Sequence, residues 1–366
     1  MIFYNIYLNY RLSLCIFETQ ITLCLMKLKS FLFLLLITYL TYGQVGGEKV
    51  YIFLSVPVSA RQASLGGKSL TSLDDINQPL WNPSIINKNL DNKFSINYVN
   101  FLADINYVSL SYARFFDKHF GSLYGNLTVV DNGKFIRANS DGTILGSFKS
   151  KDMIFNLGYS RNLPWTDFYI GANLKLIHSS IDNYSSNGFA VDISLSYYTD
   201  SKPFVVSAVL RNFGYQVSLF DENKEDLPLE VLLGFSYDLK DIPLRWYVTI
   251  DHLQRWKVAY ENPSDVQNSL NSSSDNTKIS FIGNSVRHFI IGAEFFPKGN
   301  FNIRLGYNFR RARELRLVER RTFSGLNFGF GLKMGRYKLH YAYSKYHPSS
   351  NSSTFSLDIN LESKIR

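Results

Sequence analysis

Hydrophobic and polar residues alternate with a period of two from about residue 94 to near the end of the chain. The clearest run begins with Phe301 and Ile303, which alternate with Asn302 and Arg304. Because successive side chains of a strand point to opposite faces, this pattern predicts half-buried β-strands. Fourteen strands are predicted, at 94–101, 107–116, 121–130, 153–162, 167–178, 189–199, 204–213, 229–239, 244–254, 288–296, 300–310, 325–334, 337–346 and 354–361.

The connections between these strands alternate between short turns and longer polar loops. The longer ones are 131–152, 179–188, 214–228, 255–287 and 311–324. Single-chain barrels of the bacterial outer membrane combine an even number of short tilted strands with short periplasmic turns and long outer loops. We therefore predict an all-β fold, a 14-stranded antiparallel outer-membrane β-barrel of a Gram-negative bacterium with both termini periplasmic. A soluble all-β protein would also alternate, but it has no reason to sort its connections by length.

Composition supports a membrane barrel and argues against a nucleic-acid ligand. Aromatic residues make up 16% of the chain, as expected where aromatic girdles meet a membrane surface. The mean hydropathy is nevertheless slightly negative, so apolar and polar residues must be interleaved. The net charge of +9 is modest and spread along the chain, which gives no reason to expect nucleic-acid binding.

The only long apolar run lies near the N-terminus. Lys27 and Lys29 precede ten apolar residues at 31–40, and small or polar residues follow up to Gly43. Ten residues are too few to span a bilayer as a helix, so residues 1–43 are predicted to be an upstream extension and a signal peptide, with Met26 as the true start. Cys15 and Cys24 would be removed with it, which leaves neither a disulfide nor a thiolate metal site. The predicted domains are an N-terminal plug or periplasmic segment at 44–93 and the barrel at 94–366.

Residues 44–93 do not alternate and contain turn-forming motifs. Gly66 and Gly67 permit a backbone reversal with positive φ, and Asn82 followed by Pro83 predicts a helix N-cap with proline in the first helical position. The segment is predicted to form short turns and helices against or inside the barrel lumen. The candidate plug residues are Arg61, Gly66, Gly67, Asp74, Asp75, Asn82 and Pro83.

Several motifs together carry a family resemblance. They are the pattern Pro57, Arg61, Leu65, Gly66 and Gly67, the pair Asp74 and Asp75, the step Asn82–Pro83, and the segments 97–107, 133–135, 211–214 and 252–256. They resemble the FadL-like barrels related to PorV, and are most similar to the PorQ group of the type IX secretion system. The resemblance covers essentially the whole predicted mature chain. Two features depart from it: Ser84 follows the Asn-Pro step where alanine is usual, and the chain continues beyond Leu361 to Arg366.

The resemblance implies a non-catalytic outer-membrane component of type IX secretion, which anchors the surface complex that processes and attaches secreted cargo. The implied partners are other secretion components, PorZ at the cell surface and also PorU and PorV, with the outer loops 131–152 and 255–287 as docking segments. The alternative is a FadL-type transporter of long-chain fatty acids or other hydrophobic solutes. The shared N-terminal motif does not separate the two, and a general porin is disfavoured by the plug.

Two further groups of residues are candidate contacts. His252, Gln254 and Trp256 could dock a partner, or Trp256 could simply belong to the aromatic girdle. Planar guanidinium groups bind phosphate bidentately, so arginines crowded in one outer loop could contact lipopolysaccharide, or could be a solvated loop with internal ion pairs. These arginines are Arg311, Arg313, Arg316, Arg320 and Arg321.

No enzyme or cofactor site is predicted. The six histidines fall on different elements without a metal-ligand spacing, and no Ser, His and acid trio stands out. No nucleotide-binding glycine loop is present, since Gly46–Gly47 and Gly66–Gly67 are turn material.

Overall fold

The computed structural model describes residues 49–117, 120–258, 280–314, 323–347 and 350–361, all within one compact unit that spans residues 47–366. The predicted signal peptide lies outside the described residues. The strands are β1 (Lys93–Asn100), β2 (Asn106–Asp117), β3 (Gly121–Ala138), β4 (Ile144–Asn162), β5 (Phe168–Ile181), β6 (Tyr184–Tyr197), β7 (Phe204–Ser218), β8 (Glu230–Asp238), β9 (Leu244–Ile250), β10 (Phe289–Phe295), β11 (Phe301–Asn308), β12 (Leu326–Met334), β13 (Tyr337–His347) and β14 (Ser350–Asn360). The helices are η1 (Ile52–Ser55), α2 (Ala60–Ser64), η2 (Gln78–Leu80), η3 (Pro83–Ile85), η4 (Lys88–Leu90), α4 (Phe281–Val286) and α5 (Phe309–Glu314).

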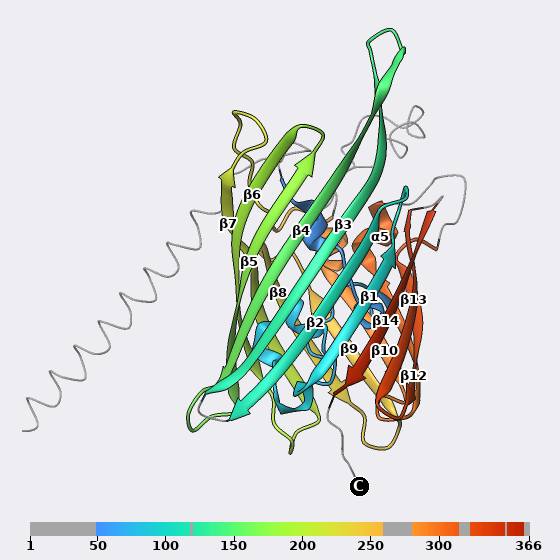
Figure 1. Cartoon of the computed structure of the whole chain (residues 1–366). Coiled ribbons are helices and arrows are strands. Elements are labelled where there is room, and N and C mark those ends of the chain that lie inside the picture. The colour runs from blue at the N-terminus through green and yellow to red at the C-terminus, as the bar shows by residue number, and fades with distance from the viewer. Residues whose placement is uncertain (1–48, 118–119, 259–279, 315–322, 348–349, 362–366) are drawn as a thin grey trace, which may run out of the picture. The chain divides into compact units, whose positions relative to one another are not determined.

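The strands form a closed antiparallel barrel in which each strand pairs with its neighbours in sequence (Figure 1). Closure joins β1 to β14 over eight residue pairs, from Lys93 opposite Asn360 to Asn100 opposite Ser353. The prediction of fourteen antiparallel strands is therefore confirmed. Among the described residues, no helix is long and apolar enough to cross a membrane.

The two faces of the wall differ as the alternation predicts. On β11, Ile303 and Leu305 are exposed on the outer face, whereas Asn302 and Arg304 are fully buried inside. A band of outward apolar side chains covers the barrel because lipid tails cannot solvate polar groups, while inward polar groups bond to one another. The fold and this band are those of an outer-membrane barrel.

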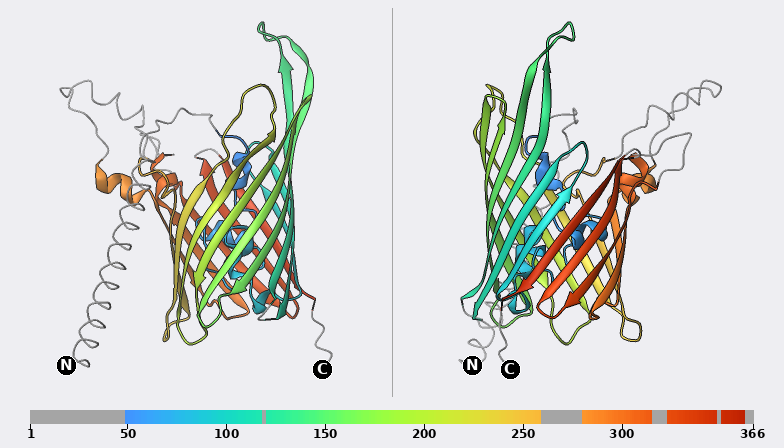
Figure 2. Two further views of the ribbon diagram at one scale, coloured as in Figure 1. Left: turned by 90° about the vertical axis from the view of Figure 1, so that its left-hand side faces the viewer. Right: turned by 45° about the vertical axis from the view of Figure 1, so that its right-hand side comes forward.

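Two predicted outer loops are instead strand extensions. β3 and β4 continue through most of 131–152 as a two-stranded ribbon that rises beyond the rest of the barrel (Figures 1 and 2). The register shifts between Asp131 and Lys134, around Gly133 with φ 81°. This bulge interrupts the alternation, which is why the ribbon resembled a loop. Similarly, 179–188 is a tight hairpin between β5 and β6, with Asp182 at φ 54°.

The remaining strand predictions are correct to within a few residues, with two exceptions at the outer rim. β9 ends at Ile250, so the predicted strand end at 251–254 is irregular. Phe309 begins the short helix α5 and does not continue β11. Much of the predicted loop 255–287 and of 311–324 lies outside the described residues.

The N-terminal segment 49–92 lies inside the barrel as a plug (Figure 1). It enters at the end that carries the ribbon, where the Val50 N–H donates to the Asp226 carbonyl at 3.0 Å. It leaves at the opposite end, where the Leu361 N–H donates to the Asn92 carbonyl at 2.9 Å. The plug-like segment of the predicted fold is thus present. The described residues 49 and 361 lie at opposite ends of the barrel, and the termini themselves lie outside the described residues.

Candidate functional site

A buried ion-pair cluster locks the plug to the wall near α2. Arg61 lies 2.9 Å from Asp74 of the plug and 2.8 Å from Glu294 of β10, and only 2% of its side chain is exposed. Arg304 of β11 approaches the same Glu294 at 2.8 Å, and the Tyr247 hydroxyl donates to it at 2.9 Å. Burial alone would raise the pKa of Asp74, but the neighbouring Arg61 holds that pKa well below its usual range. The cluster therefore stays ionised and joins plug to barrel.

A second cluster lies closer to the outer rim. Lys68 of the plug contacts Glu230 at 2.7 Å and Asp251 at 3.0 Å, and Arg310 lies 3.5 Å from Asp251. The His252 ring lies 3.0 Å from Asp251, and burial together with Lys68 and Arg310 lowers the pKa of His252 to about 4. This histidine is therefore neutral near pH 7, and the contact of Lys68 with Asp251 ties the outer end of β9 to the plug.

The predicted docking residues are mostly used internally. His252 belongs to the second cluster, and Gln254 bonds to the β8 strand, with its amide oxygen 2.8 Å from the Val231 N–H. Trp256 is partly exposed and stacks on His288 with ring centroids 5.1 Å apart. Trp256 alone among the three presents a large surface, so partner docking remains a prediction for it.

The predicted lipopolysaccharide arginines also differ in position. Arg311 points toward the plug, where its guanidinium lies 3.8 Å from the ring centroid of Tyr346 and bonds to Asn327 at 3.3 Å. Arg313 is exposed on α5. Arg316, Arg320 and Arg321 lie outside the described residues.

The plug motif residues fit the plug against the wall. The backbone of Leu65 and Gly66 packs directly against Gly306 of β11, and Gly66 has φ 94°, which glycine adopts without strain. Asn82 caps η3 as predicted, because its side-chain oxygen accepts from the Ser84 N–H at 3.1 Å. Pro83 occupies the first position of that turn.

Asp75, another of the predicted plug residues, is buried beside the ion-pair clusters. Its carboxylate accepts from the Asn77 N–H at 3.0 Å. Burial raises the pKa of Asp75 to about 6, against the opposing effect of Arg61. Asp75 therefore gains a proton far more readily than its neighbour Asp74.

An apolar groove crosses the outer face of the wall over β4, β5, β6 and β7. Its volume is about 530 Å³ and its lining includes Phe155, Leu176, Phe189 and Tyr215. The pairing of β6 with β7 is irregular here, with register shifts between Asn187 and Gly188 and between Val191 and Ile193. The groove thus lies at an irregular part of the barrel wall. A second groove of about 600 Å³ lies on the outer face of β1, β12, β13 and β14.

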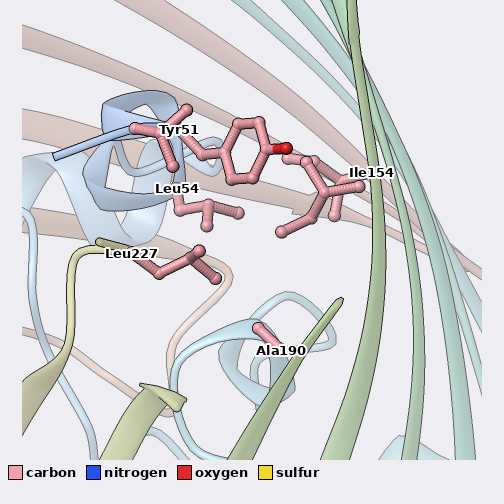
Figure 3. Packing of buried hydrophobic residues seen from close by; sticks show 7 residues of the cluster. Tyr51, Leu54, Ile154, Ala190 and Leu227 are labelled. Carbon is pink, nitrogen blue, oxygen red and sulfur yellow. The ribbon is translucent and has the colours of Figure 1, made fainter. Parts of the chain in front are cut away.

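Gly188 separates the first groove from an apolar cluster inside the barrel. A Cβ added at Gly188 would overlap the ring of Tyr51, so this ring closes the wall from within. Tyr51 packs with Leu54, Ile154, Ala190 and Leu227 (Figure 3), and its hydroxyl bonds to Ser186 at 2.6 Å. The groove and the inner cluster are therefore separated by a glycine and one aromatic ring.

The sequence did not nominate Glu294, Lys68, Tyr51 or Gly188. Glu294 could have been found as an acidic residue on the inner phase of a predicted strand, the phase that Arg304 occupies on β11. Tyr51 and Gly188 carry no comparable signal, because their role depends on which strand the plug touches. Among the described residues, no cluster of three or more His, Cys, Asp or Glu could hold a metal ion.

Comparison with known proteins supports the fold only. No family model matches the chain, and no curated protein matches its sequence. The toluene transporter TbuX of Ralstonia pickettii superposes with a TM-score of 0.51 at 9% identity, over 85% of this chain and 100% of that one. The TodX monoaromatic hydrocarbon channel (deltaS2 mutant) gives 0.48 at 12% identity, over 82% and 96%. A Pseudomonas aeruginosa FadL homologue gives 0.47 at 8% identity, over 84% and 98%. The barrel with its plug is thus similar to the fold of TbuX.

Proposed function

We propose that this barrel is a FadL-type outer-membrane transporter of small hydrophobic molecules, which enter through the groove over β4–β7. The observation that carries the proposal is the meeting of two apolar surfaces at Gly188, where the outer groove faces the ring of Tyr51. The similarity of the fold to TbuX, described as a toluene transporter, supports the same reading. The ribbon end would face outward and the short turns would face the periplasm.

The proposed path needs only a local change. A hydrophobic solute partitions from water into the lipid, because burial of apolar surface is favourable. It can therefore reach the groove by lateral diffusion within the membrane. The Tyr51 hydroxyl bonds to Ser186, which also accepts from Gln216 at 3.2 Å, so turning the ring leaves Ser186 a remaining partner. The ring's departure would connect the groove to the cluster of Leu54 and Leu227. The closed barrel elsewhere would stay intact.

A second candidate function is the anchoring of a type IX secretion complex, with PorZ and also PorU and PorV as partners. The observation that favours it is the ribbon of β3 and β4, which extends past the barrel rim (Figure 2). Its tip exposes Ile136, Ile144 and Leu145 by 68%, 68% and 62%. Exposed apolar groups on a free two-stranded ribbon suit a protein contact, because such a ribbon alone is marginally stable in water.

A deletion strain distinguishes the two functions. Impaired uptake of toluene or long-chain fatty acids with normal surface proteins supports transport. Loss of sorted, surface-attached cargo with normal uptake supports secretion and refutes transport. Complementation with a chain whose ribbon is shortened to a turn between Asp131 and Lys151 then tests the ribbon itself. The matched control replaces only Asn183 of the β5–β6 hairpin by glycine, which leaves the ribbon and the ion pair of Arg137 with Asp182 in place.

A further inference from the structure

Three lysines gather on the outward face of the ribbon, just above the lipid-facing wall. Lys134 of β3 and Lys149 of β4 stand directly opposite one another, and Lys151 is the next outward residue of β4. All three side chains are exposed, and within the described part of the chain no ion pair or hydrogen bond joins their ammonium groups to another residue; the Lys151 carbonyl accepts from the Ser180 hydroxyl at 3.2 Å. Like charges placed opposite each other destabilise a strand pair, so an anionic occupant would stabilise this ribbon.

The nearby acidic groups neutralise the lysines only in part. Asp131 lies opposite Lys151 in the register and offsets one of the three positive charges, while its carboxylate also accepts from the Gly133 N–H at 3.1 Å. Asp182 forms an ion pair with Arg137. The lysine cluster therefore keeps a positive excess on the outer face.

The height of the cluster matches the headgroup level of a membrane. On β4 the exposed positions between Arg161 and Lys151 are apolar: Tyr159, Leu157, Phe155 and Met153. The ten residue steps from Arg161 to Lys151, at about 3.3 Å each and a tilt of about 40°, give a height of about 25 Å. This equals the usual thickness of the apolar band of such barrels. Arg161 and Lys151 therefore mark the two borders of the apolar band. Lys149, two residues from Lys151, and its partner Lys134 lie farther out.

We propose that Lys134, Lys149 and Lys151 bind the phosphate groups of a glycolipid in the outer leaflet. Lysine ammonium groups are common phosphate ligands, and the acyl chains of such a lipid would lie against Met153 and Phe155 below. Ser180, which pairs with Lys151 across β4 and β5, lies beside the site on the outward face. This site does not include Arg311 of α5, whose guanidinium lies over the ring of Tyr346. It does not depend on the proposed transport function, although the acyl chains of the bound lipid would lie along the edge of the proposed entry groove, which Met153 and Phe155 line.

The test measures binding of diphosphorylated lipid A to the purified, detergent-solubilised barrel by native mass spectrometry. The variant carries Lys134→Gln, Lys149→Gln and Lys151→Gln. A charge-matched control carries glutamine at three exposed lysines outside the ribbon, Lys88 of η4 and the turn residues Lys240 and Lys298. Each lysine near an anionic lipid contributes roughly fivefold to affinity, so the ribbon variant should bind about a hundredfold more weakly than the parent. The control should bind like the parent, and both variants should keep the heat-modifiable gel mobility of a folded barrel.

Two further binding experiments identify the ligand. Lipid A without phosphates should bind weakly to the parent, the ribbon variant and the control, and an excess of inorganic phosphate should not displace the intact lipid. Equal binding by the ribbon variant and the parent would overturn the proposal. So would phosphate-independent binding, or full displacement by inorganic phosphate, which would leave a general anion site only.

Discussion

The ion pairs of Arg61 give the sharpest prediction about the plug. In Arg61→Met the long apolar stem is kept and the charge is lost, so Asp74 and the fully buried Glu294 lose a partner. Removing one member of a buried pair usually costs about 3–5 kcal/mol. Glu294 keeps Arg304 and the Tyr247 hydroxyl, so the lower end, about 3 kcal/mol, is expected for plug docking.

Cysteine labelling measures this cost, because none of the described residues is a cysteine. A cysteine in place of the fully buried Ser64 reacts only when the plug moves away from the wall. A loss of about 3 kcal/mol corresponds to roughly a hundredfold faster labelling. The matched control is Arg161→Met, an exposed arginine of the outer wall, which should change the rate by less than about threefold. Equal rates in the Arg61 and Arg161 variants would refute the view that this cluster holds the plug.

Three other predictions concern the plug and its surroundings. In the folded state the pKa of Asp75 is raised to about 6, so protonated Asp75 stabilises the fold. This contribution is full below about pH 4 and is lost as the pH rises through 6. Asp75→Asn should therefore flatten this part of the pH profile of the free energy of unfolding. Gly66→Ala should lower the free energy of unfolding by about 1–3 kcal/mol in denaturant titrations, because the φ of Gly66 is 94°. The control is Gly125→Ala, whose Cβ would meet no atom within 4 Å, and it should cost less than about 0.5 kcal/mol. Tyr51→Ala should raise hydrophobic-solute uptake several-fold, and unchanged or reduced uptake would count against its role as a closure.

The alternation predicted the strands because one physical rule acts along the whole wall. Outward positions such as Ile303 face lipid and inward positions such as Arg304 face the plug. The alternation of apolar and polar residues in each strand therefore follows from its two environments. The rule fails at the bulge near Gly133, where one extra residue shifts the phase. It also fails beyond the membrane, where β5 and β6 keep pairing through serine-rich positions that need not be apolar.

The candidate site was predictable only in part. Arg61, Asp74 and the glycine pair were recognisable as motif residues, but the partner of Arg61 on the barrel wall is Glu294, more than two hundred residues away. Such a contact depends on barrel closure and on the path of the plug, and the local alternation of residues predicts neither. The groove at Gly188 depends in addition on a register shift between two strands, which has no signature in either strand alone.

The most direct test of the transport account is uptake of radiolabelled toluene by a deletion strain that carries Gly188→Val. A valine side chain at Gly188 would occupy the space that the ring of Tyr51 now fills, so it would block the junction of the groove and the inner cluster even with that ring displaced. The account predicts uptake near the level of the uncomplemented strain, and normal uptake with Gly125→Val at equal expression. Equal uptake by both variants would contradict entry through this part of the wall.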